Sequence, residues 1–276
     1  ANDADAIDLG STADTTGNTL ELSDAELDNI TATTLRVGSA LSGAITVSQA
    51  ISPANVTNLS LLSDAGLSQG ASDTITVTNL RIDVDEAVSL NEANFVTTLA
   101  ANVADAGQAF SFREANALQL DTIDGTTGVT INAANATFTI DAGTFTQDTG
   151  EIITASGLEI EAGGSVTLTE ANAITTLAAN ISGAGNSFDF TEANGFSVGS
   201  VGSTDGVNTV NGAVTLTATT GNITVTNTAA ANDVGAGTST ISITAAADAA
   251  YIAIDASADV EATGSVTLVA DKMDLD

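Results

Sequence analysis

The sequence predicts an all-β protein, a parallel β-helix (solenoid) with about 20 residues per coil. Three observations predict this fold. Short triplets alternate apolar, polar and apolar residues, several of these triplets follow one another at a spacing of about 20 residues, and the chain contains a long internal repeat. Gly, Asn and Asp punctuate the gaps, and the chain holds one proline and only 3% aromatic residues. Small residues and tight turns of this kind suit closely stacked coils.

Each triplet is expected to form the core of a short strand, because period-two alternation with β-branched residues marks a half-buried strand. Dividing 276 residues by about 20 predicts roughly 14 coils, hence a rod roughly 65 Å long at ~4.8 Å per coil. Long amphipathic helices are not indicated, although residues 245–250 could form a short helical turn. The triplets, in chain order, lie at 75–77, 82–84, 118–120, 138–140, 158–160, 166–168, 214–216, 223–225, 241–243, 252–254 and 266–268.

The internal repeat covers about residues 88–165 and 166–243, and 18 of the 33 aligned positions from 88 to 120 are identical. Because its period of 78 is close to four units of 20, one repeat is expected to fill about four coils. We expect residues 1–276 to form a single continuous β-helix that is an excised part of a longer protein. A β-sandwich array and a long antiparallel barrel are the rival folds, but both normally use more aromatic residues and hairpin turns.

The composition excludes several classes of function. Four Lys and Arg residues stand against 35 Asp and Glu, a net charge of −31, which would repel nucleic acid and anionic lipid. Without Cys or His there is no disulfide, thiolate zinc site or His-based triad. No apolar stretch approaches ~18 residues, so no transmembrane segment is expected. No enzymatic activity is expected either.

The tripeptide Glu-Ala-Asn recurs four times and is the sharpest local motif, with a 22-residue spacing inside each repeat. If this spacing equals one coil, the like residues of each pair stack. We expect an asparagine ladder that bonds the turn backbone, with the glutamates in water and no cofactor required. A Ca²⁺ site on the glutamates is the alternative, and a glycosidase-type carboxylate pair is a third reading. The glutamates are Glu92, Glu114, Glu170 and Glu192, and the asparagines are Asn94, Asn116, Asn172 and Asn194.

Two other sets of residues suggest contacts with ligands. Arg81, Asp83 and Asp85 would share one outward face, as a Ca²⁺-dependent polysaccharide lyase requires, although a solvated strand face is the simpler interpretation. The outward threonines do not recur regularly enough for ice binding. An adhesin would expose an apolar or aromatic patch, for which the candidates are Phe95, Phe145 and Tyr251.

Three segments near the N-terminus carry a family resemblance: LELSDAELDNITA at 20–32, TLRVG at 34–38 and GAITV at 43–47, with LTEAN at 168–172 farther along. These phrases resemble the repeat regions of filamentous-haemagglutinin-like exoproteins, bacterial proteins exported by two-partner secretion. The resemblance implies a right-handed parallel β-helix at the bacterial cell surface. The Asn-Pro-Asn motifs of that family's secretion domain are missing here, where Pro53 is the one proline.

The resemblance implies a non-enzymatic extracellular protein, the stalk or contact region of an adhesin. Its partner would be a glycan or protein on a host cell or a neighbouring cell. The alternative is a self-assembling subunit of an extracellular fibre or biofilm matrix, in which copies associate end to end or laterally. Lateral association of such acidic faces would need bridging cations such as Ca²⁺.

Overall fold

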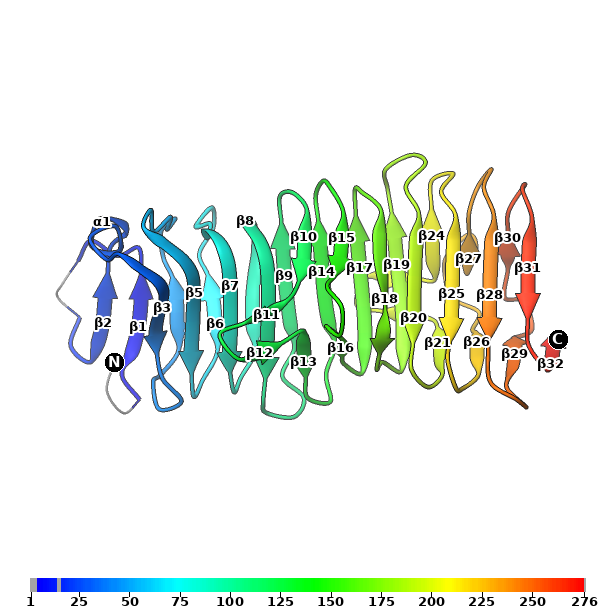
Figure 1. Ribbon diagram of the computed structural model, residues 1–276, viewed down its shortest axis with the longest axis horizontal. Helices are drawn as coiled ribbons and strands as arrows, with labels where there is room; N and C mark the ends of the chain where they lie inside the picture. The colour runs from blue at the N-terminus through cyan, green and yellow to red at the C-terminus, as the bar shows by residue number, and fades with distance from the viewer. Residues whose placement is uncertain (1–3, 14–15, 276) are drawn as a thin grey trace.

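A computed structural model describes residues 4–13 and 16–275 of the chain. Its parallel strands stack as a β-solenoid of about 11 coils with about 22 residues each, seen lengthwise in Figure 1. The predicted all-β parallel β-helix is confirmed. In the described residues, no helix is long and apolar enough to cross a membrane.

The strands form two parallel ladders, here called face A and face B, and 28 strands join into one hydrogen-bonded sheet. The strand β8 (Val88–Val103) bends from face A to face B at a register shift between Leu90 and Asn94. Face A contains β1 (Ala6–Leu9), β2 (Thr19–Leu22), β4 (Ile45–Val47), β6 (Leu67–Gln69), β9 (Phe110–Glu114), β14 (Ala136–Ile140), β17 (Gly157–Ala162), β19 (Thr176–Ile181), β21 (Phe196–Val198), β24 (Val207–Thr209), β26 (Ile223–Val225), β27 (Val234–Gly235), β29 (Tyr251–Ile254), β30 (Val260–Glu261) and β32 (Lys272–Leu275). Face B contains β3 (Ala32–Gly38), β5 (Val56–Ser63), β7 (Thr76–Val84), β10 (Leu118–Leu120), β13 (Val129–Ile131), β15 (Phe145–Gln147), β16 (Ile153–Thr154), β18 (Val166–Asn172), β20 (Phe188–Glu192), β25 (Val214–Ala218), β28 (Ile241–Ala245) and β31 (Val266–Val269).

The coils differ in length, and the longer ones explain why there are fewer than the 14 predicted. The coil from Leu80 to its partner Leu99 is much shorter than the coil from Ile223 to its partner Ile252. The additional residues of the longer coils lie in turns and hairpins, so the strands keep their register. Residues 245–250 form the end of β28 and a turn, not the short helical turn considered from the sequence.

The helix α1 (Asp24–Leu27) lies beside the first coils at the N-terminal end of the solenoid (Figure 1). Ser23 and Glu26 form a capping box at its start, with the side chain of each bonded to the backbone of the other. This reciprocal bonding satisfies N–H groups that the first helical turn leaves without partners. Leu27 is fully buried against the core, so α1 covers part of the apolar interior.

The interior is a column of aliphatic and phenylalanine side chains that follows the period-two alternation of the strands. Phe110, Phe138 and Phe145 stack through the central coils, with ring centroids 5.5 Å and 4.9 Å apart in successive pairs. Tilted aromatic pairs at these distances add to the stabilisation from apolar burial. The continuous core makes the coils mutually dependent, because no coil can bury its apolar residues alone.

Equivalent positions in the two copies of the internal repeat lie on opposite faces of the solenoid. Val88 opens the first copy and pairs with Phe110 in face A. Val166 opens the second copy and pairs with Phe188 in face B. Three and a half coils of about 22 residues account for the period of 78. The expectation that one repeat fills about four coils is therefore wrong, and equivalent side chains face opposite ways.

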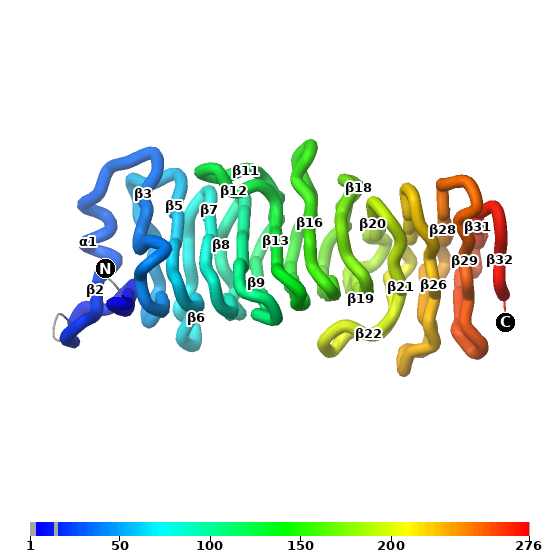
Figure 2. Tube along the Cα trace, turned by 90° about the horizontal axis from the view of Figure 1, so that it is seen from below, coloured from blue at the N-terminus to red at the C-terminus, as the bar shows by residue number. Residues whose placement is uncertain are grey.

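Each copy also carries a short antiparallel hairpin at the same repeat position. The first hairpin consists of β11 (Thr122–Ile123) and β12 (Thr126–Thr127), and interrupts face B between β10 and β13. The second consists of β22 (Ser200–Val201) and β23 (Thr204–Asp205), and interrupts face A between β21 and β24. Figure 2 shows the two hairpins on opposite sides of the rod.

Candidate functional site

The Glu-Ala-Asn motifs lie at the corners where the chain passes between the two faces, but they do not stack like on like. Asn94 is opposite Glu114, and Asn172 is opposite Glu192. These four side chains are almost fully buried. The predicted ladders of Glu92 on Glu114 and of Asn94 on Asn116 are therefore wrong in register, as are their counterparts in the second copy.

Asn94 holds the first corner together. Its Oδ1 accepts hydrogen bonds from the backbone N–H of Ile75 at 2.8 Å and from Nε2 of Gln69 at 2.6 Å. Its Nδ2 donates to the carbonyl oxygens of Glu92 and Arg113, each at 3.0 Å. The amide thus joins three successive coils through their backbone groups.

Glu114 occupies the same corner one coil later. Its Oε2 accepts the N–H of Val96 at 2.8 Å, and its Oε1 accepts the N–H of Asn116 at 3.2 Å. Burial raises the pKa of this carboxyl group to about 7, although the N–H donors oppose the shift. The prediction that this glutamate lies in water is therefore wrong. Asn116, the asparagine of the same Glu-Ala-Asn motif, is exposed.

The second copy builds the same corner on the opposite edge. Asn172 accepts the N–H of Ile153 at 2.8 Å and donates to the carbonyl oxygen of Thr191 at 2.9 Å. Glu192 accepts the N–H of Asn194 at 2.5 Å, and burial raises its pKa. Glu170 is half-buried, with its Oε2 bonded to the N–H of Gly150 at 3.0 Å.

These corners do not have the donor set of a calcium site. The carboxylates of Glu114 and Glu192 face backbone N–H groups, whereas Ca²⁺ requires several oxygen ligands around it. Glu92 and Glu170 lie outside these buried pairs. Across the parts of the chain that are described, no group of three Asp, Glu, His or Cys side chains is placed to hold a metal ion.

The first hairpin is fixed to face B by a carboxylate that the motif analysis did not single out. Asp124, at the hairpin tip, accepts two hydrogen bonds from Arg36, one from the Ser60 hydroxyl at 2.8 Å, and one from Arg81 at 3.3 Å. The Arg36 guanidinium, followed by Ser60 and Arg81, holds the pKa of Asp124 well below its usual range. Arg81 also bonds Asp83, so its guanidinium is not free to serve as the base of a lyase.

The second hairpin is fixed to face A with the roles reversed. Here the carboxylate is Glu159, on β17, and the hairpin supplies the donors. Both the backbone N–H and the hydroxyl of Ser203 donate to Glu159 Oε1, at 2.8 Å and 3.0 Å. Thr137 donates to the other oxygen at 3.0 Å. From the sequence, only the 78-residue repeat could have indicated that the second hairpin bonds to face A, and only if the half-coil offset that places equivalent positions on opposite faces were known.

A shallow hollow lies between each hairpin and the sheet below it, and the two hollows are lined by equivalent repeat positions. The hollow on face B measures about 360 Å³ and that on face A about 280 Å³. Asp83, Asn102, Thr126, Thr127 and Thr130 line the first, and Glu161, Asn180, Thr204, Asp205 and Asn208 occupy the corresponding positions in the second. Each hollow therefore offers an acid, an amide and hydroxyl groups to a polar ligand.

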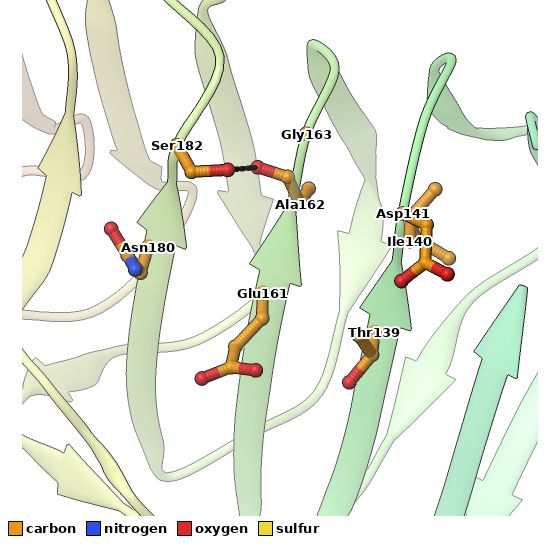
Figure 3. Close-up of a pocket in the computed structure, with 8 residues that line it drawn as sticks. All are labelled: Thr139, Ile140, Asp141, Glu161, Ala162, Gly163, Asn180 and Ser182. Atoms are coloured by element: carbon orange, nitrogen blue, oxygen red, sulfur yellow. Dashed lines mark hydrogen bonds between the residues drawn. The ribbon is translucent and has the colours of Figure 1, made fainter. Parts of the chain in front are cut away.

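A third hollow, of about 260 Å³, adjoins the second on face A. Figure 3 shows Thr139, Glu161 and Asn180 side by side on three neighbouring strands, with Ser182 bonded to the carbonyl oxygen of Ala162. The hollow is shallow and mostly polar. Glu161 is shared with the hairpin hollow, so face A carries a continuous polar depression.

The three aromatic candidates for a contact patch have different outcomes. Phe145 is fully buried and belongs to the core. Phe95 is 47% exposed on face B, and Tyr251 is 39% exposed on face A. Tyr251 lies in a further hollow, of about 470 Å³, together with polar residues of neighbouring coils.

Comparison of the chain with protein-family models, with curated proteins and with solved structures returned no match.

Proposed function

We propose that the chain is a non-enzymatic, extracellular stretch of a bacterial surface protein, the β-helical stalk and contact region of a filamentous-haemagglutinin-like adhesin. The observation that supports this most is the single hydrogen-bonded sheet running through about 11 coils, with shallow polar hollows on both faces. Such a rod holds its contact surfaces at a fixed distance from an anchoring point. The partner is a glycan or protein on a host cell or a neighbouring cell.

The distribution of charge favours contact with uncharged or cationic surfaces. Three of the four basic residues are used within the molecule, because Arg36 and Arg81 pair with Asp124, and Arg113 pairs with Asp141. Most of the remaining acidic side chains are partly or fully exposed, and their charge repels anionic polymers. No catalytic constellation supports an enzymatic alternative among the clusters described above.

Adhesion is tested with fluorescent beads coated with the purified chain and applied to epithelial monolayers and to bacterial lawns. We expect saturable attachment that soluble folded chain competes away. Beads coated with the heat-unfolded chain are the matched control. Attachment no greater than this control on every surface would overturn the proposal.

A second function is lateral self-assembly into an extracellular fibre or matrix. Copies that each carry a net charge of −31 repel one another, so their side-by-side association requires bridging cations such as Ca²⁺. Sedimentation velocity with millimolar Ca²⁺ and with chelator tests this function: oligomer ladders support it, and a single monomeric species in both buffers excludes it.

A further inference from the structure

Face A carries a groove whose lining residues are all uncharged, although the chain has a net charge of −31. Two adjoining hollows, of about 470 and 340 Å³, share Thr175 and together form this groove. The lining residues that carry the argument are Asn135, Thr175, Asn194, Ser197, Thr224 and Tyr251. The other three hollows described above each contain at least one carboxylate.

The groove runs along the axis of the rod. Apart from Ser200 and Val201 on hairpin strand β22, its residues lie at the starts of six face A strands, β14, β17, β19, β21, β26 and β29, which pair in that order. Five steps of ~4.8 Å give a length of roughly 24 Å. The groove is therefore long and shallow, the shape that suits a linear chain lying along the solenoid.

Its polar groups are available to a ligand. The side chains of Thr175, Asn194, Ser197 and Thr224 make no hydrogen bond to another described residue. Asn222 is held in place, because its Oδ1 accepts the backbone N–H of Tyr251 at 3.0 Å. Free hydroxyl and amide groups can both donate and accept, as the hydroxyl groups of a sugar do.

Tyr251 closes one end of the groove and is 39% exposed. An exposed aromatic ring beside fixed polar groups combines an apolar face with hydrogen-bonding partners. A pyranose ring has the complementary chemistry, because it presents C–H groups on its flat face and hydroxyl groups at its edge. The lack of charge in the groove and the acidic surface around it disfavour uronic-acid and sulfated chains.

We propose that the groove from Asn135 to Tyr251 binds a neutral oligosaccharide, with Tyr251 stacked on a sugar ring. The inference rests on the proposed contact function and names its ligand class. The groove lies on face A alone, so a surface glycan is bound along one side of the stalk.

The chain offers a direct reporter, because it has one tyrosine and no tryptophan. Tyrosine emission therefore comes from Tyr251 alone. The protein is titrated with hexasaccharides of glucose, mannose and galactose, and separately with oligogalacturonate and a heparin hexasaccharide. We expect at least one neutral hexasaccharide to change the emission saturably and to protect Tyr251 from acrylamide quenching, while the anionic chains do neither.

In the second experiment, titration calorimetry measures the binding of the same hexasaccharide to variants of the protein. Tyr251→Ala is expected to weaken binding of that hexasaccharide at least about tenfold, and Tyr251→Phe to retain most of it. Phe95→Ala, which removes the exposed aromatic ring on face B, is the matched control and is expected to bind like the parent. Unchanged thermal unfolding verifies that each variant is folded.

The inference is overturned if no neutral hexasaccharide binds at millimolar concentration, if an anionic chain binds more tightly, or if Tyr251→Ala binds like the parent chain. Bead attachment separates this result from the proposed function. Beads that attach although the groove binds no sugar leave the adhesin proposal standing. Beads that fail to attach, with the groove still binding a neutral hexasaccharide, overturn the adhesin proposal alone.

Discussion

Asp124 and Arg36 lie far apart in the sequence, yet the two oxygens of the carboxylate accept hydrogen bonds from Nε and Nη2 of the guanidinium. The contact exists because hairpin β11–β12 folds back over face B toward coils formed earlier in the chain. Asp124 also bonds Ser60 on β5 and Arg81 on β7. The hairpin therefore lies across β3, β5 and β7, which already pair through their backbones, and adds a side-chain bond to each of these strands.

Replacing Asp124 with Asn should loosen this fastening. The amide keeps the shape of the carboxylate but loses its charge, so the donors from Ser60 and Arg81 bond more weakly. We expect a loss of about 1 kcal/mol in the free energy of unfolding, measured by urea titration. Asp189→Asn, which changes an outward carboxylate of face B that bonds no other described side chain, should leave the urea midpoint unchanged. An equal loss in both variants would argue against the fastening role.

The close packing of the second hairpin on Glu159 predicts that any side chain at position 202 lowers the stability of the fold. A Cβ there would overlap Oε2 of Glu159, and the residue has a φ of +59°. Gly202→Ala should therefore push the Glu159 carboxylate out of its hydrogen bonds with Ser203 and Thr137 and destabilise the fold by about 1–3 kcal/mol. Thermal unfolding measures the loss, and faster hydrogen exchange at the amide of Ser203 would locate it.

Gly125→Ala provides the matched control for the first hairpin. Gly125 also has a positive φ, of +90°, but nothing lies within 4 Å of a Cβ built on it. The control therefore isolates the conformational cost of an alanine in the left-handed region. If Gly202→Ala costs no more than Gly125→Ala, close packing on Glu159 is not what places the second hairpin.

The corner contacts predict that Asn94 and Asn116 contribute very differently to stability, although each ends a Glu-Ala-Asn motif. Asn94→Ala removes a buried side chain that joins three coils and leaves the N–H of Ile75 without its acceptor. We expect a loss of about 2–4 kcal/mol in the free energy of unfolding. Asn116→Ala, at the exposed position of the next motif, should change it by less than about 0.5 kcal/mol. Similar losses in denaturant titrations of the two variants would contradict the observed register.

The sequence predicted the strands better than the corners, and the reason is physical. Alternation at Val166-Thr167-Leu168 shows directly which side chains face inward, and the structure buries both apolar residues. At Glu92 and Glu114 the local sequence is the same, but the backbone is not. In β9 the inward positions continue from Phe112 to Glu114, whereas in β8 a register shift after Leu90 makes Asn94 the next inward residue.

The lengths of the coils and the contacts of the hairpins could not be predicted from the sequence, for a related reason. A single average spacing could not show that the coil from Leu80 to Leu99 is so much shorter than the coil from Ile223 to Ile252. The offset of half a coil between repeats follows from the sum of such unequal coils. The pairing of Asp124 with Arg36 depends on where the hairpin tip reaches in space, which no spacing in the sequence records.

The buried corner carboxylates predict that the protein becomes less stable as the pH rises toward neutrality. Burial raises the pKa of Glu114 from 4.5 to about 7, so between these values the folded chain binds more protons at this site than the unfolded chain. The free energy of unfolding therefore falls as the pH rises through that window, by about 1–3 kcal/mol. Glu192 acts in the same direction. Asp124 acts oppositely but only at lower pH, because its pKa is lowered from 3.8.

Urea titrations at pH 5 and pH 8 measure this dependence. Glu114→Gln removes the titrating group while keeping one acceptor for the N–H of Val96, so the variant should lose most of the difference between the two pH values. Glu92→Gln, at the half-buried position of the neighbouring motif, is the matched control and should keep the parent's difference. A parent chain that is more stable at pH 8 than at pH 5, or a Glu114→Gln variant with an unchanged difference, would show that Glu114 is not the group responsible.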